Sequence, residues 1–213
     1  MNQEPKNPEQ DNPQSAETGR TPEADTLPTT PQIWVGSLSD YNNGVLHGQW
    51  IDATQDEDEV RQQITAMLSR SPTMAEFGDL AEEYGIFDYD NFYGLRIDEY
   101  DDITQVTKLA RLIDEHGEAF AAWAEQVGRD TATSDDAGEK FLNSYMGCYR
   151  SKEDYVEGLL DDLGVVDELD KSVDPILRGY VNIDYSMLAQ DLELGGDVTF
   201  VEANSGGWWA FIE

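Results

Sequence analysis

The sequence has few of the residues on which several common classes of protein depend. A single cysteine, Cys148, among 213 residues excludes an intramolecular disulfide. The two histidines, His47 and His116, show no paired metal-ligand spacing with that thiol, so no metal site is expected. Lys and Arg number only 13, too few for the basic patches that bind nucleic acid or anionic membranes. No apolar run approaches the roughly 18 residues that a membrane-spanning helix requires.

Acidic residues, in contrast, are abundant. Asp and Glu number 45, which sets the formal net charge at -32 and the pI near 4.1. Hydrophobic residues still make up 39% of the chain, too much for a protein that is disordered throughout. The length allows one domain or two to three small ones with thin cores that association would stabilise. The opening residues, MNQEPKNPEQ, lack the basic and apolar regions of a secretory signal, so the expected compartment is the cytoplasm.

The first 31 residues differ in composition from the rest. They hold six of the eight prolines, no aromatic residue, six acids and two bases. This composition predicts a disordered, proline-rich tail over residues 1–31. Because the tail carries only -4, residues 32–213 carry -28 of the net charge.

Residues 32–99 are predicted to form an N-terminal α+β domain. A hairpin is expected from strands at 33–35 and 45–51 with a turn at 42–44. Thr54 and Glu57 fit a capping box that starts a helix, and Pro72 ends it. Further strands are predicted at 85–89 and 95–97.

The rest of the chain divides into a helical stretch and a mixed one. Apolar stripes predict helices over 103–113 and 120–127, and Phe141, Leu142 and Tyr145 suggest a third, giving a helical domain over 100–147. A C-terminal α+β domain over 148–213 is expected to begin with a helix at 151–163, capped by Ser151, and to end in a hairpin of strands 198–201 and 208–212. The predicted fold class is therefore α+β.

The acids beyond residue 31 occur in every segment. The helix at 151–163 is predicted to bury Tyr155, Leu159, Leu160 and Leu163. This arrangement stacks Asp154, Glu157 and Asp161 on the opposite face, with almost no Lys or Arg nearby, at a cost of about 0.2–0.5 kcal/mol per like-charge pair. General solubility, adaptation to high salt, or a surface shaped for a site that evolved to hold a polyanion would each explain such a charge.

Three stretches of the sequence carry a family resemblance. They read IWVGSLSDYNNG at 33–44 with LHGQWIDA at 46–53, EYGIFDY at 83–89, and YVNIDY at 180–185 with AQDLE at 189–193. The first resembles the opening segment of ArdA-type antirestriction proteins, the second their central strand, and the third their signature near the C-terminus. The resemblance covers about 32–213 and excludes the tail.

The resemblance implies an elongated, acidic, dimeric protein made of three small domains. Such proteins imitate DNA and block type I restriction-modification enzymes by filling the groove formed by their specificity and methyltransferase subunits. They are commonly encoded on mobile genetic elements, and they require no cofactor. Their dimer contact lies toward the C-terminal domain, which corresponds loosely to residues 154–163 here.

The candidate residues for a phosphate-mimicking surface are acids in the folded part of the chain, and no catalytic residue is predicted. The candidates are Asp79, Glu82, Glu83, Asp98, Glu99, Asp101, Asp102, Asp114, Glu115, Glu118, Asp154, Glu157, Asp161 and Asp162.

Two other functions remain open from the sequence. One is an acidic hydrolase of a mobile element, because an acid pair at catalytic separation could arise by chance among so many carboxylates. The other is an acidic chaperone for basic DNA-binding proteins. Asp88, Asp90 and Glu99 fall at three ligand positions of an EF-hand loop, but Phe92 occupies another ligand position and Gly94 comes one residue late, so this match is accidental.

Overall fold

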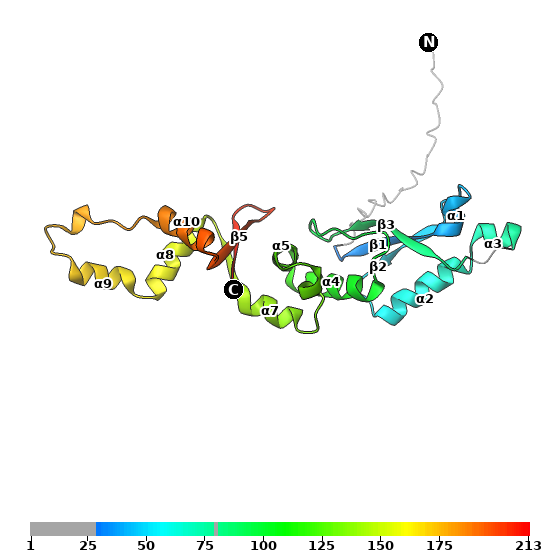
Figure 1. Cartoon of the computed structure of the whole chain (residues 1–213), viewed down its shortest axis with the longest axis horizontal. Helices are drawn as coiled ribbons and strands as arrows, with labels where there is room; N and C mark the ends of the chain where they lie inside the picture. The colour runs from blue at the N-terminus through cyan, green and yellow to red at the C-terminus, as the bar shows by residue number, and fades with distance from the viewer. Residues whose placement is uncertain (1–28, 79–80) are drawn as a thin grey trace, which may run out of the picture.

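The chain is long and narrow (Figure 1). The computed structural model describes residues 29–78 and 81–213, so nearly all of the tail predicted over 1–31 lies outside the described residues. Pro31 is part of the fold, because it is buried and its carbonyl accepts a hydrogen bond from the backbone N–H of Ala53. The predicted α+β class and elongated form are confirmed.

A three-stranded antiparallel sheet forms one end of the molecule. Its strands are β1 (Gln32–Ser37), β2 (Gly48–Asp52) and β3 (Tyr84–Asp90), in the order β2-β1-β3. The predicted strands at 33–35, 45–51 and 85–89 are thus confirmed, although the second begins only at Gly48. The connection of the first two contains the short helix α1 (Leu38–Asn42), where only a turn was predicted. Ser37 starts this helix because its hydroxyl accepts a hydrogen bond from the N–H of Asp40.

Two sequence predictions in this region are wrong. Residues 95–97 are not a strand, because Asn91 and Tyr93 have positive φ angles of 63° and 51° that turn the chain out of the sheet. Thr54 does not cap the following helix; its N–H and hydroxyl both donate to Asp52 instead. Asp56 occupies the N-cap position of α2.

Helices α2 (Glu57–Leu68) and α3 (Pro72–Phe77) separate β2 from β3. The middle of the chain is helical, as predicted, with α4 (Ile103–His116), α5 (Glu118–Val127), α6 (Arg129–Ala132) and α7 (Ala137–Ser144). Tyr145 does not extend the last of these helices but begins strand β4 (Tyr145–Tyr149). The cause is long-range, because β4 pairs with the final strand of the chain.

The second half continues with α8 (Lys152–Asp162), α9 (Val165–Ser172), the short 3₁₀ helix η1 (Arg178–Tyr180) and α10 (Tyr185–Gly195). The predicted final hairpin is confirmed as β5 (Val198–Glu202) and β6 (Trp208–Ile212). These strands form a second antiparallel sheet in the order β4-β6-β5. The Ser151 cap of α8 is also confirmed, since its hydroxyl accepts from the N–H of Asp154 at 3.1 Å.

The buried apolar side chains form two clusters. The larger one runs from the first sheet through α2, α4 and α5 to Phe211, so the segments 32–99 and 100–147 share it. The smaller one joins α8 and α10 to the second sheet. On α8, Leu163 is 67% exposed and Val156 is buried in its place, contrary to the predicted face. The division into three domains stays a prediction.

Candidate interaction surface

Basic side chains in the described residues are almost all engaged in ion pairs. These ranges contain 11 Lys and Arg against 38 Asp and Glu. Ten of the bases contact a carboxylate: Arg61, Arg96, Lys108, Arg111, Arg129, Lys140, Arg150, Lys152, Lys171 and Arg178. Most carboxylates within the same ranges therefore have no Lys or Arg to neutralise them.

The candidate acids just before α4 lie together, but three of them have basic partners. Asp98 pairs with Arg96 at 2.7 Å, on the surface. Asp101 is different, because its side chain is only 16% exposed, accepts from the N–H of Asp98 and contacts Arg129 at 2.9 Å. Asp101 therefore holds α6 against this loop and is poorly placed to contact another protein. Glu99, between them, is half-buried.

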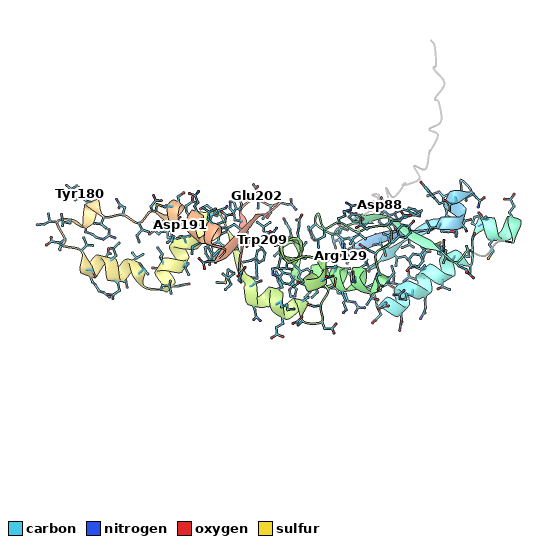
Figure 2. All side chains as sticks on the ribbon, in the orientation of Figure 1. Asp88, Arg129, Tyr180, Asp191, Glu202 and Trp209 are labelled. Atoms are coloured by element: carbon cyan, nitrogen blue, oxygen red, sulfur yellow. The ribbon has the colours of Figure 1, made fainter. Side chains whose placement is uncertain are left out.

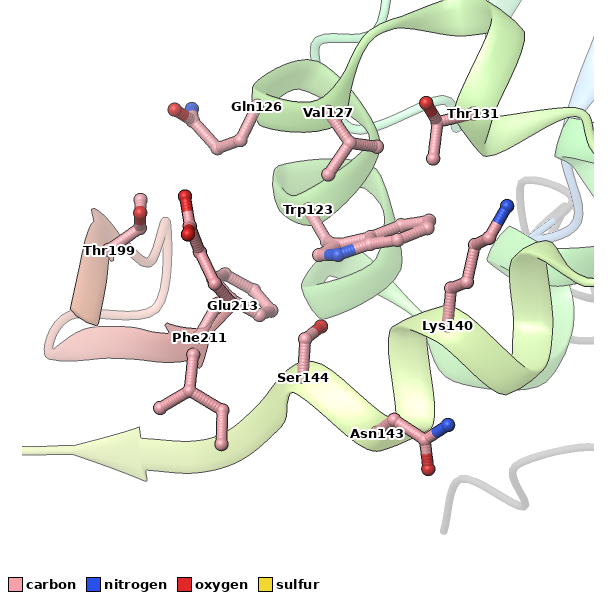
Figure 3. A pocket seen from close by; sticks show the side chains of 11 residues that line it. Trp123, Gln126, Val127, Thr131, Lys140, Asn143, Ser144, Thr199, Phe211 and Glu213 are labelled. Atoms are coloured by element: carbon pink, nitrogen blue, oxygen red, sulfur yellow. The ribbon is translucent and has the colours of Figure 1, made fainter. Parts of the chain in front are cut away.

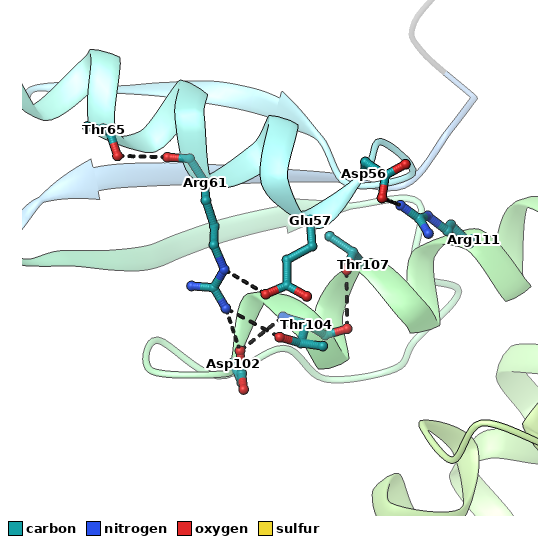
Figure 4. A network of polar contacts seen from close by, with 8 residues as sticks. All are labelled: Asp56, Glu57, Arg61, Thr65, Asp102, Thr104, Thr107 and Arg111. Carbon is teal, nitrogen blue, oxygen red and sulfur yellow. Dashed lines mark hydrogen bonds and ion pairs between the residues drawn. The ribbon is translucent and has the colours of Figure 1, made fainter.

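Asp102 belongs to a polar network that ties α2 to α4 (Figure 4). Its carboxylate caps α4 by accepting the N–H of Thr104 at 3.0 Å and also pairs with Arg61 at 3.2 Å. Arg61 contacts Glu57 at 2.7 Å as well. The Thr104 N–H is the main cause that lowers the pKa of Asp102, and the Arg61 guanidinium is the main cause that lowers the pKa of Glu57. Both carboxylates therefore stay ionised, but they share one cation.

The candidate acids near the ends of α4 and β3 differ in exposure. Asp114 and Glu115, in the last turn of α4, are exposed, and so are Glu82 and Glu83 ahead of β3. Glu118 is half-buried and accepts the backbone N–H of Asn204 at 2.6 Å, which joins α5 to the β5–β6 turn.

Asp79, the remaining candidate in this half of the chain, lies outside the described residues.

On α8 the candidate acids are less uniform than the sequence indicated. Asp154 is half-buried and pairs with Arg150 at 2.7 Å, so this acid does have a nearby base. Glu157, Asp161 and Asp162 are exposed. Three of the four predicted α8 acids are thus available to a partner.

Several exposed acids were not selected from the sequence. Asp88 on β3, Asp191 on α10 and Glu202 on β5 are exposed, and Asp88 lies apart from the other two, which come from neighbouring elements (Figure 2). Strict alternation along β3 would have placed Asp88 on the same face as buried Ile86, and a β-bulge opposite Trp34 and Val35 turns it outward, so the sequence held no signal for this acid. Asp40, in contrast, is fully buried, so it stabilises the fold and is not accessible to a partner.

The sequence model described as antirestriction protein (ArdA) matches residues 33–205. The chain belongs to the ArdA family. The match runs from β1 to the turn after β5, so it includes every described candidate acid. No curated protein matches the chain. ArdA antirestriction proteins are inhibitors rather than enzymes, and membership in the family implies interaction with restriction enzymes.

This ArdA-family chain also has a cavity of about 460 Å³ between α5, α7 and β6 (Figure 3). Its walls include the rings of Trp123 and Phe211, with Lys140 at one side. The Lys140 ammonium pairs with Asp136 at 2.9 Å. Within residues 29–78 and 81–213, no three His, Cys, Asp or Glu side chains are grouped so as to hold a metal ion.

A helix that crosses a bilayer must be long and almost entirely apolar. In the part of the chain that the structure describes, no helix could cross a membrane.

Proposed function

We propose that this protein is a mimic of DNA that occupies the DNA-binding groove of type I restriction-modification enzymes. Its carboxylates stand where phosphates normally lie and engage Lys and Arg of the specificity and methyltransferase subunits, so that DNA cannot enter. The observation that carries this proposal is the distribution of exposed acids along a narrow molecule, from Glu76 on α3 to Asp167 on α9, two helices that lie at opposite ends of it (Figure 1). Few bases in the described ranges remain to offset them.

The amount of charge suits a substitute for DNA. B-DNA carries one negative charge per roughly 1.7 Å of its axis, so a net charge of -28 over residues 32–213 corresponds to about 48 Å, or about 14 base pairs. A dimer doubles this length. The site of action is then the cytoplasm, and escape from host restriction would serve a mobile genetic element that carries the gene.

We propose that the protein forms a homodimer through the end of the molecule that holds α8, α9 and α10. Large apolar side chains are exposed there: Leu163, Val165, Ile176, Leu177, Tyr180, Met187 and Leu194. A soluble surface rarely gathers so many apolar side chains unless they contact a partner. A two-fold dimer would bury the same patch on both copies.

Light scattering at micromolar concentration is expected to give the mass of a dimer. Replacing Ile176, which is 82% exposed, with Asp should shift the mass toward a monomer because it places charge in an apolar contact. Leu46→Asp is the matched control, since Leu46 is 75% exposed near the other end of the chain and should leave the mass unchanged. A monomer mass for the unmodified protein would contradict the proposed dimer.

Competition with DNA tests the mimicry directly. The protein should displace cognate DNA from a purified type I methyltransferase in proportion to its concentration, with no turnover. Added salt should weaken the binding of the protein, because ions screen attraction between carboxylates and a basic groove. Failure to displace DNA, or an affinity that does not change between low and high salt, would contradict the proposal.

A further inference from the structure

The first sheet has two chemically different faces. Ile33, Val35 and Ile51 are buried on the side where α2 packs, which Figure 1 shows below the sheet. Side chains alternate along a strand, so Trp34 of β1 and Trp50 of β2 point to the opposite side. These two residues are direct cross-strand partners. We call this second side the aromatic face.

The backbone of the aromatic face is shaped around the ring of Trp34. A Cβ atom at Gly48 would lie 2.6 Å from this ring, and a Cβ at Gly36 would lie 2.7 Å from it. Glycine at both positions therefore lets the indole lie close against the strands. Phe87 contacts Trp34 with ring centroids 5.9 Å apart, and Tyr41 of α1 contacts Phe87 at 5.1 Å.

The rings of the aromatic face remain accessible. Trp50 is 47% exposed and Tyr41 is 57% exposed, while Trp34 and Phe87 are half-buried. Exposing this much aromatic surface is unfavourable in water, and a partner that covers it would regain that free energy.

The charged residues that β1, β2 and β3 present on the aromatic face are all negative. Asp52 follows Trp50 by two residues on β2, and Asp88 lies directly opposite Trp34 on β3. Asp90, two residues further along β3, lies opposite Gln32. None of the three aspartates forms an ion pair with a described residue, and no outward position of these three strands holds Lys or Arg. A partner must therefore be cationic as well as able to cover aromatic rings.

We propose that the aromatic face binds arginine side chains of a basic protein partner. A guanidinium is planar and weakly hydrated, so it stacks on an indole or phenol ring while its N–H groups donate to a neighbouring carboxylate. Asp88 opposite Trp34, and Asp52 beside Trp50, supply such carboxylates. The inference rests on the proposed function for the identity of the partner, a restriction-modification enzyme, and adds that part of the contact selects arginine over lysine.

Titration of the full chain with hexa-arginine and hexa-lysine peptides tests this inference. The indole N–H resonances of Trp34 and Trp50 report whether the peptide reaches the aromatic face. Both peptides should bind, because both are cationic. The arginine peptide should bind about two- to fivefold more tightly for each exposed ring on which it stacks, and it should shift both indole resonances.

Three variants distinguish the contribution of the Trp50 ring to peptide binding from the contribution of the Asp88 charge. Trp50→Thr should remove most of the preference for arginine, and Trp50→Phe should retain part of it because a ring remains. Asp88→Asn should weaken both peptides equally. Leu142→Thr is the control, because Leu142 is 60% exposed on α7, outside both the aromatic face and the proposed dimer contact, and its loss should leave the preference unchanged.

Other outcomes would overturn the inference. Equal affinities for the two peptides, or unmoved indole resonances, would show that arginine does not stack on this face. Resonances that shift when residues 1–28 are deleted would show that the chain's own N-terminal segment occupies it, and a shift with protein concentration would show a second copy there. None of these results affects competition with DNA by the unmodified protein, so the two proposals fail separately.

Discussion

Replacing Asp40 with alanine is expected to lower the free energy of unfolding by about 3 kcal/mol. Asp40 is fully buried, and one of its oxygens accepts from the Ser71 hydroxyl and from the Thr73 N–H, each at 2.9 Å. These contacts join α1 to the start of α3. A hydrogen bond to a charged group contributes about 1.5–3 kcal/mol, and the variant leaves buried donors without their acceptor. Urea denaturation of the full chain measures the loss.

The contribution of Asp40 should also depend on pH. Burial by itself raises the pKa of Asp40, but hydrogen bonds from Thr73, Ser37 and Ser71 outweigh it and hold the pKa well below its ordinary value. A lowered pKa in the folded state means that the stabilisation is complete above the unfolded value, about 4, and is lost as the pH falls through the folded value. Asp40→Ala should therefore flatten the acid side of the stability curve.

The exposed acid Glu157 provides the control for this test, and Glu157→Gln should leave stability at neutral pH nearly unchanged. If the unmodified protein and Asp40→Ala lose stability in parallel between pH 5 and pH 2, other carboxylates cause the acid sensitivity and the role given to Asp40 is wrong.

Neutralising five exposed acids together is expected to weaken inhibition by about 70-fold. The five are Glu157, Asp161, Asp162, Asp167 and Asp191, changed to the corresponding amides. Each exposed ion pair with the target is worth about 0.5 kcal/mol, so five give about 2.5 kcal/mol. Each single change should cost at most a few-fold. Competition with DNA for the methyltransferase measures the affinity of each variant.

Two controls accompany the five-acid variant. Its stability should be unchanged or slightly higher, because like charges on α8 and α10 no longer repel. Its mass by light scattering should match that of the unmodified protein, so that a lost dimer is not mistaken for lost charge. A single amide substitution that abolished inhibition in a folded protein would point to catalysis and contradict a mimic.

Local sequence patterns predicted much of the fold. The strand at 33–35, the cap at Ser151 and the final hairpin each depend on neighbouring residues, and all three are confirmed. Tyr145 was misassigned because its strand is specified by pairing with Phe211, far along the chain. Residues 95–97 were misassigned because the positive φ of Tyr93 depends on the tertiary structure.

The candidate surface was less predictable than the fold, although the family resemblance itself is confirmed. Sequence gives the number of acids but not which of them meet a base. Asp101 pairs with Arg129 and Asp102 with Arg61, across 28 and 41 residues respectively, and no local pattern reports such contacts. The exposure of Asp88 was not predictable either, since alternation places it on the face of buried Ile86 and only the β-bulge in β3 turns it outward.

The position of β6 in the middle of its sheet bears on how the chain is made. A ribosome releases β4 and α8 long before it releases Trp208–Ile212, yet β6 is the strand that joins β4 to β5. Phe211 belongs to the larger apolar cluster and Ala210 to the smaller one. Neither cluster is therefore complete until β6 has been synthesised. A nascent chain that stops before β6 would expose apolar surface from both clusters and invite proteolysis. Cells would thus remove incomplete copies before they reach a target.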